Sequence, residues 1–192
     1  MARIGIIYYS MYGSTYELAT VLAEGVEKAG GEAHLRRVPD LLPDEVRTTE
    51  AVAAAIERQA HVPEARVDEL PEFDGLLIGS PTRYGSSTSQ LQNFLDQTGP
   101  LWMDGKLVGK PVGFFTGAAT AHGGHESTLL GMSTFAYHHG MVIVPVGYGL
   151  AEEVGSTRTG GGPYGATHLT PMGDDSGLDE DEREVALKHA AQ

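Results

Sequence analysis

The chain has 192 residues, a formal net charge of −13 at pH 7, 41% hydrophobic residues and no cysteine. This length suits one domain with a buried core, and the missing cysteine excludes disulfides, thiolate metal sites and cysteine redox chemistry. The negative charge opposes binding to nucleic acid or anionic lipid. Because the N-terminus has neither a signal-peptide nor a membrane-span pattern, we expect one cytoplasmic domain over residues 1–192, without stable membrane insertion.

The first predicted element is a buried strand over Ile4–Tyr9, which ends at a polar turn before a helix. The turn consists of Ser10, Met11, Tyr12, Gly13, Ser14 and Thr15. Unpaired amides and the dipole at a helix N-terminus favour an anion, and the hydroxyls add donors. No Lys or Arg lies between Ile4 and Lys28. The turn therefore suits one terminal phosphate held without a basic side chain nearby. The alternative is that Ser and Thr only cap the helix.

A second strand is predicted over residues 33–38, followed by a long connection. Arg36 and Arg37 fit either a clamp for a nicotinamide 2′-phosphate or a solvated strand end, and the second interpretation is favoured. Residues 39–72 are rich in proline and charge, with one Ala-rich helical segment over Glu50–Arg58. We expect this connection to be surface decoration or an oligomer contact.

The third predicted strand, Phe73–Gly79, is continuously apolar and therefore belongs to a buried parallel sheet. It ends in a polar loop that contains Pro81, Thr82, Arg83, Tyr84 and Gly85. Open α/β sheets bind ligands at such strand ends, which favours a site here. The alternative is that Tyr84 packs in the core and Arg83 pairs with an acid. A helix is predicted over residues 86–97.

The fourth predicted strand, residues 111–116, precedes a third glycine-rich loop before another helix. A fifth strand is expected over 141–146, then a long polar loop over 147–175 and a last helix over 179–191, which stops early. The loop contains a G-x-G-x-x-G match at 160–165, but no strand precedes it, so we reject a dinucleotide fingerprint. The histidines at 122, 125, 138 and 139 lack carboxylates or thiols at ligand spacing, so no metal is predicted.

Four strings in chain order resemble the WrbA family of FMN-dependent NAD(P)H:quinone oxidoreductases, also called type IV. They are S-M-Y-G at 10–13, P-T-R-Y-G at 81–85, F-L-D-Q-T-G-x-L-W at 94–102 and A-Y-H-H-G-M-V-I-V-P at 136–145. The third loop departs from the family pattern: Gly-Ala-Ala-Thr replaces a run with two hydroxyls, and His125 replaces a glutamine. Backbone donors do most of the binding in such a loop, so the departure bears on affinity and on the second-substrate pocket.

The resemblance implies a flavodoxin-like, three-layer, doubly wound sheet of five parallel strands in the order 2-1-3-4-5. It also implies FMN as cofactor, NADH or NADPH and small quinones as substrates, a ping-pong two-electron reduction, and a homotetramer. The cofactor-binding residues that it implies are Ser10, Met11, Tyr12, Gly13, Ser14, Thr15, Pro81, Thr82, Arg83, Tyr84, Gly85, Thr116, Gly117, Ala118, Ala119, Thr120, Gly123, Gly124 and His138.

Two further roles follow from the resemblance. Tyr12 and Trp102 would sandwich the planar substrates in a cavity assembled between subunits, and His138 would donate a hydrogen bond to the quinone or relay a proton. The alternatives are that Trp102 is a core or interface anchor and that His138 only caps a helix. Two rival functions also remain: a one-electron carrier of the flavodoxin type, and a regulatory module of this fold associated with a repressor.

Overall fold

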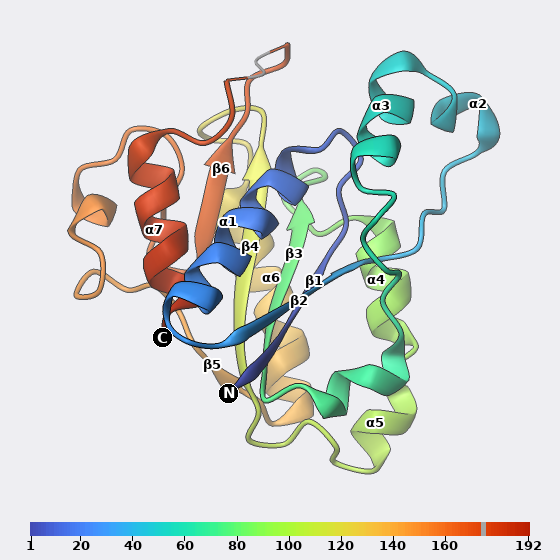
Figure 1. The fold of residues 1–192 in the computed structure, drawn as a ribbon, viewed down its shortest axis with the longest axis vertical. Helices are drawn as coiled ribbons and strands as arrows, with labels where there is room; N and C mark the ends of the chain where they lie inside the picture. The colour runs from blue at the N-terminus through green and yellow to red at the C-terminus, as the bar shows by residue number, and fades with distance from the viewer. Residues whose placement is uncertain (174–175) are drawn as a thin grey trace.

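The protein, described here by a computed structural model over residues 1–173 and 176–192, is a parallel sheet between two helical layers (Figure 1). The strands described are β1 (Arg3–Tyr8), β2 (Glu32–Arg37), β3 (Gly75–Pro81), β4 (Pro111–Ala118), β5 (Val142–Ile143) and β6 (Ala166–Leu169). Every pairing between them is parallel. The order β2-β1-β3-β4-β5 confirms the predicted topology, and β6 also pairs with β4.

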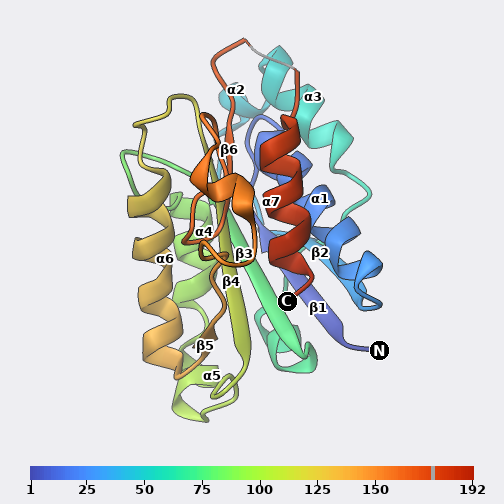
Figure 2. The same cartoon turned by 90° about the vertical axis from the view of Figure 1, so that its left-hand side faces the viewer.

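The helices described are α1 (Ser14–Lys28), α2 (Asp44–Arg47), α3 (Glu50–Arg58), α4 (Ser89–Asp96), α5 (Gly99–Met103), α6 (His125–His139) and α7 (Glu180–Ala190), with 3₁₀ turns η1 (Val67–Glu72) and η2 (Glu152–Gly155). Helices α1 and α7 cover one face of the sheet, and α4 and α6 cover the other (Figure 2). Alternation along β1 serves both layers, because Ile6 and Tyr8 pack toward α1 while Ile7 packs in the opposite cluster.

The fifth position of the sheet differs from the prediction. Instead of one strand over 141–146, Val142–Ile143 pairs with one end of β4 and β6 pairs with the other end. The chain leaves the ladder at Pro145, which has no N–H to donate, and Gly147 follows with φ +66°. The predicted loop over 147–175 therefore contains η2 and β6. Its last two residues, 174 and 175, lie outside the described part of the chain.

Strand β6 is held at the sheet edge by one carboxylate from α7. The backbone N–H groups of Gly160 and Leu169 each donate to Glu182 Oε1 over 2.8 Å, and His168 Nδ1 lies 2.7 Å from Glu182 Oε2. A Cβ on Gly160 would lie 2.2 Å from the carbonyl oxygen of Thr167. Glycine at 160 is thus required by packing against β6, and a Cβ on Gly165 would lie 2.0 Å from the carbonyl oxygen of Phe114, so two of the three glycines in the G-x-G-x-x-G match have a packing role.

None of the helices in the described ranges is long and apolar enough to cross a membrane. The carboxyl ends of β1, β3 and β4 all lie at the upper edge of the sheet in Figure 1. The three polar loops singled out in the sequence follow these strand ends, so the fold gathers them at one edge.

Candidate functional site

The turn between β1 and α1 is held in shape by Ser10. Its Oγ accepts hydrogen bonds from the backbone N–H groups of Gly13 and Tyr16, each over 3.2 Å. Gly13 has φ +102°, a left-handed conformation that glycine adopts without a steric penalty. Since a hydroxyl has one donor and two acceptor sites, the Ser10 O–H proton stays available to a ligand. The turn therefore presents both amide and hydroxyl donors at a helix N-terminus.

Thr15 provides the direct test of whether this turn fits an anion. Its side chain is 1% exposed, and its Oγ1 has no hydrogen-bond partner within the described residues. A Cβ built on Gly117 would lie 4.0 Å from this oxygen, so Thr15 faces the third loop. A buried hydroxyl without a partner is costly, and a ligand oxygen at the turn would satisfy it. The turn thus fits the terminal phosphate of a nucleotide.

The expectation that no basic side chain lies near the turn is wrong. Arg58, from α3 in the long connection, reaches it: Nη2 lies 3.4 Å from the carbonyl oxygen of Tyr12, and Nη1 donates to Glu17 over 2.9 Å. The next residue, Gln59, donates from Nε2 to the carbonyl oxygen of Ser10 over 3.2 Å. The sequence interval of more than forty residues left no local signal for these contacts. The long connection is therefore more than surface decoration.

The second loop keeps its polar residues out of the core. Arg83 forms no ion pair with any described residue; its Nη2 lies 3.4 Å from Met11 Sδ in the first turn. Tyr84 is fully exposed and has φ +52°, an uncommon backbone conformation for a residue with a Cβ. Thr82 donates its N–H to the carbonyl oxygen of Gly117 over 2.9 Å. The alternative that Arg83 pairs and Tyr84 packs is therefore not what the structure has.

The third loop joins the other two. A Cβ on Gly124 would lie 2.7 Å from the Cα of Gly85, so these loops touch. Thr116 is fully buried and donates to the carbonyl oxygen of Ser80 over 2.6 Å, which commits its hydroxyl to the sheet. Ala119 and Thr120 are exposed, whereas Gly117 and Ala118 are buried in β4 and Gly123 is intermediate.

His125, the residue that replaces a glutamine in the resemblance, points inward. Its Nε2 lies 3.2 Å from the carbonyl oxygen of His168, and burial lowers its pKa. A neutral imidazole there donates to that carbonyl and ties the start of α6 to β6. His125 is thus a structural link rather than part of the loop surface.

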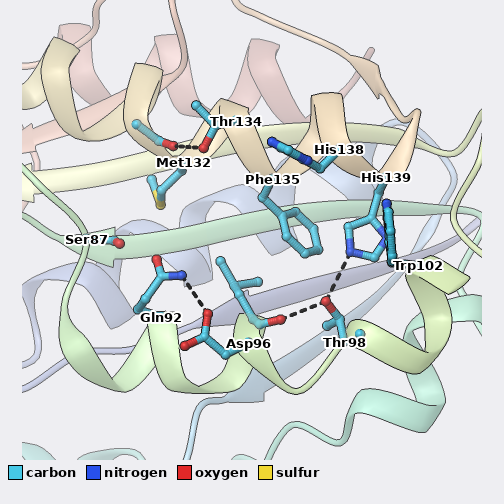
Figure 3. A pocket seen from close by; sticks show the side chains of 13 residues that line it. Ser87, Gln92, Asp96, Thr98, Trp102, Met132, Thr134, Phe135, His138 and His139 are labelled. Carbon is cyan, nitrogen blue, oxygen red and sulfur yellow. Dashed lines mark hydrogen bonds between the residues drawn. The ribbon is translucent and has the colours of Figure 1, made fainter.

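Trp102 and His138 lie away from the three loops of their own chain. They line a pocket of about 340 Å³ between α4, α5 and the second half of α6 (Figure 3); its lining extends to Ser87, two residues after the second loop. Helix α6 starts at the third loop, and at about 1.5 Å per residue His138 lies about 20 Å along it from His125. A single chain therefore does not bring Trp102 and His138 to Tyr12.

The pocket combines open aromatic surface with one buried histidine. Trp102 is 51% exposed and is not part of the core. His139 is buried, its Nε2 lies 3.0 Å from Thr98 Oγ1, and its ring packs against Phe135 at 4.4 Å between centroids. Burial lowers the pKa of His139, which favours the neutral ring. The pocket is a wall against which a flat apolar group can stack.

The two arginines at the end of β2 are occupied elsewhere. Arg36 pairs with Glu69 and Arg37 with Glu64, each over 2.9 Å. This favours the structural interpretation over a 2′-phosphate clamp. Across residues 1–173 and 176–192, no group of three or more His, Cys, Asp or Glu side chains could hold a metal ion.

A doubly wound sheet with three joined loops at its carboxyl edge, one of them an uncharged phosphate-type turn, defines the class of flavodoxin-like proteins. Residues 2–155 match the family model described as NADPH-dependent FMN reductase, and the chain belongs to this family. The sequence is 45% identical over 171 residues to an "NAD(P)H dehydrogenase (quinone)" of Rhizobium rhizogenes, covering 88% of this chain and 84% of that relative.

A second relative with the same description, from Geobacter sulfurreducens, is 49% identical over 169 residues and covers 85% of this chain and 82% of its own. Among solved structures, a "flavodoxin, WrbA-like protein" from Agrobacterium tumefaciens superposes with a TM-score of 0.65 at 22% identity, over 100% of this chain and 94% of that chain. Together these similarities confirm the predicted WrbA resemblance and the flavodoxin-like fold.

Proposed function

We propose that this protein is an NAD(P)H:quinone oxidoreductase that uses FMN. The observation that carries the proposal is the junction of three loops around a helix N-terminus where a buried hydroxyl, Thr15 Oγ1, lacks a partner in the described chain. Relatives with about 45% identity carry the description NAD(P)H dehydrogenase (quinone), which supports the same activity. The rival one-electron carrier has the fold in common but gives no reason for an exposed tryptophan beside a pocket.

The residues of the three loops would hold the cofactor by its two ends. Ser10 and Thr15 hydroxyls, with the amides of the first turn, would bind the phosphate. The loop over 81–85 and the loop over 117–124 would frame the isoalloxazine, with Tyr84 beside the ring. When bound, FMN supplies two-electron transfer between the nicotinamide and the quinone; the protein positions these groups and excludes water.

We further propose that a homotetramer completes the site. Exposed apolar side chains, which are typical of a subunit contact, lie on α5, in the segment after it, at the end of α6 and on β5: Trp102, Met103, Val108, Tyr137 and Val142. A neighbouring copy would bring its Trp102 and His138 to the loops of this chain. Trp102 and Tyr12 would then stack on the planar substrate, and a ring nitrogen of His138 would donate a hydrogen bond to a quinone oxygen. Because Arg36 and Arg37 are already paired, they are not available as a 2′-phosphate clamp, and the proposal covers both NADH and NADPH.

The test combines a flavin titration with an activity assay. We expect the protein to bind FMN with quenching of flavin fluorescence and, once loaded, to oxidise NADH or NADPH with benzoquinone. Replacing Ser10 with Ala and Thr15 with Val together is expected to weaken FMN binding by at least about 1.5 kcal/mol. The control is Thr20→Val, because the Thr20 hydroxyl donates to Glu17 within α1, away from the turn. An unchanged FMN titration in the double variant would remove the phosphate assignment.

A further inference from the structure

Helix α3 belongs to the long connection between β2 and β3 and is seen at the upper right of Figure 1. Its end contacts the turn between β1 and α1. Its last turn is anchored there by Gln59, which is only 4% exposed. Gln59 Nε2 donates to the carbonyl oxygens of Ser10 over 3.2 Å and of Ala55 over 2.8 Å. A buried amide thus bridges the end of α3 and the start of the turn.

Arg58 approaches the same turn from its outer side. Its Nη2 lies 3.4 Å from the carbonyl oxygen of Tyr12, and a Cβ built on Gly13 would lie 1.7 Å from that nitrogen. The guanidinium therefore occupies the space that any side chain at position 13 would need. The side chain is about half exposed, and Glu17 fixes its other nitrogen at 2.9 Å.

These contacts bind two carbonyl groups of the turn and involve none of its N–H groups. Because the Ser10 and Tyr12 carbonyls are bound from the α3 side, the turn is held by its carbonyl groups, while the Gly13 N–H donates to Ser10 Oγ within the turn. The turn itself has no cationic residue, and the chain carries a formal charge of −13. An anion would therefore gain from a nearby guanidinium even without direct contact, since charges in a partly desolvated site interact over several ångströms.

We propose that Arg58 and Gln59 are positioning residues for the FMN phosphate. Gln59 and Arg58 hold the turn in its binding conformation, and Arg58 supplies the positive charge that the turn lacks. Glu17 orients the guanidinium and offsets part of its charge. This inference rests on the proposed function, because it requires a phosphate at the turn.

The decisive experiment measures the affinity of the full chain for FMN and for riboflavin, which lacks the phosphate, by flavin fluorescence at low and high salt. We expect Arg58→Gln to weaken FMN binding about tenfold, to leave riboflavin binding unchanged and to flatten the salt dependence of FMN binding. Arg58→Lys, which keeps the charge but not the planar fork, is expected to lose only about threefold. The matched control is Arg66→Gln, an exposed arginine that pairs with Asp68 in η1.

Glu17 separates a phosphate role from a merely structural ion pair. If Arg58 acts on the phosphate, Glu17→Gln should strengthen FMN binding about twofold, opposite in sign to Arg58→Gln. If the pair only ties α3 to α1, the two substitutions would change both flavins alike, and the inference would be overturned. Gln59→Met, checked for folding by its melting temperature, should weaken FMN binding about fivefold.

The two proposals fail in different ways. Wild-type protein that binds FMN no more tightly than riboflavin would remove the phosphate site and hence the proposed function. Wild-type protein with a clear preference for FMN that Arg58→Gln retains in full would leave the phosphate site in place and overturn only the role of Arg58.

Discussion

The sites at the two ends of α6 differ in how much of each is formed within a single chain. At the start of α6, the three loops touch one another, the Ser10 and Tyr12 carbonyls are bound within the chain, and Thr15 Oγ1 is left for a ligand. At its end, Trp102 is half exposed beside an open pocket of about 340 Å³. One end is assembled by folding alone, whereas the other presents apolar surface.

This difference suits two different functions, cofactor binding at one end of α6 and substrate binding at the other. A cofactor that stays bound benefits from a preformed site, because the ordering of its loops is complete before binding. Substrates that bind and leave in each turnover need a site that stays accessible to solvent on at least one side. Tyr12 therefore lies near the start of α6 and Trp102 and His138 near its end, although the family motifs link all three to one cavity. Association of two copies would bring them together.

Substitution of Trp102 by Ala gives the largest expected effect. Removing the stacking wall should lower kcat/KM for benzoquinone by about thirtyfold or more, while the affinity for FMN stays unchanged, because in the proposed site the loops of one chain hold FMN and Trp102 stacks on the substrate. Steady-state kinetics and flavin titration measure the two quantities. Trp102→Phe should retain most of the activity, and Leu41→Ala, at an exposed apolar residue of the long connection, is the control. A comparable loss of FMN affinity would contradict the separation of the two ends.

Mixing two impaired variants, at an FMN concentration that loads the wild type but not the double variant, tests whether the ends meet between copies. Trp102→Ala lacks the stacking wall, and the double variant with Ser10→Ala and Thr15→Val lacks the two hydroxyl donors proposed for the phosphate. Refolded together, they should regain several-fold more activity than either alone, since some sites then combine an intact turn with an intact Trp102. Each variant refolded by itself is the control. Activity that never exceeds the sum of the two would show that one chain supplies the whole site.

Periodicity and loop chemistry predicted most of the fold, because these features depend on residues close together in the sequence. The strands β1, β3 and β4 are continuous apolar runs, and each ends at glycine and hydroxyl residues, so both their burial and the place of their loops follow from nearby residues. The split of the fifth strand was missed because the apolar run from Met141 continues past Pro145, where the ladder ends. Strand β6 depends on Glu182, which is distant in sequence.

The site was predictable only in part for the same reason. The turn residues stand together in the sequence, but Arg58 contacts Tyr12 across 46 positions and no spacing indicates it. The distance of His138 from the loops follows from the direction of α6, which the sequence does imply. What a single chain cannot reveal from its pattern is whether residues of one motif serve their own chain or a neighbour.

Gly13→Ala tests how strictly the conformation of the turn between β1 and α1 is required for FMN binding. Alanine at φ +102° is strained, and its Cβ would displace Arg58 from the turn. We expect FMN binding to weaken about tenfold, in line with about 1–2 kcal/mol for a left-handed residue with a Cβ. Gly30→Ala is the matched control: Gly30 has φ +84°, but nothing lies within 4 Å of its Cβ position, so only stability should fall. Equal FMN affinity in both variants would show that the turn tolerates a side chain.

The smallest expected effect is a pH dependence of stability that both ends of α6 share. Burial lowers the pKa of His125 at the start and of His139 at the end, below the value of 6.5 in an unfolded chain. Below about pH 6.5 the unfolded chain therefore binds more protons than the folded one, so the free energy of unfolding falls as pH drops from 7 to 5.

His139→Gln should reduce this slope by at most about 1.4 kcal/mol per pH unit, the value for one proton. Chemical denaturation at several pH values measures the slope, and His138→Gln, an exposed neighbour, is the control. His125→Gln should reduce it similarly, because its ring is also buried and neutral. If only one of the two variants changed the slope, only the histidine at that end of α6 would contribute to the pH dependence, and the two ends would not be equivalent.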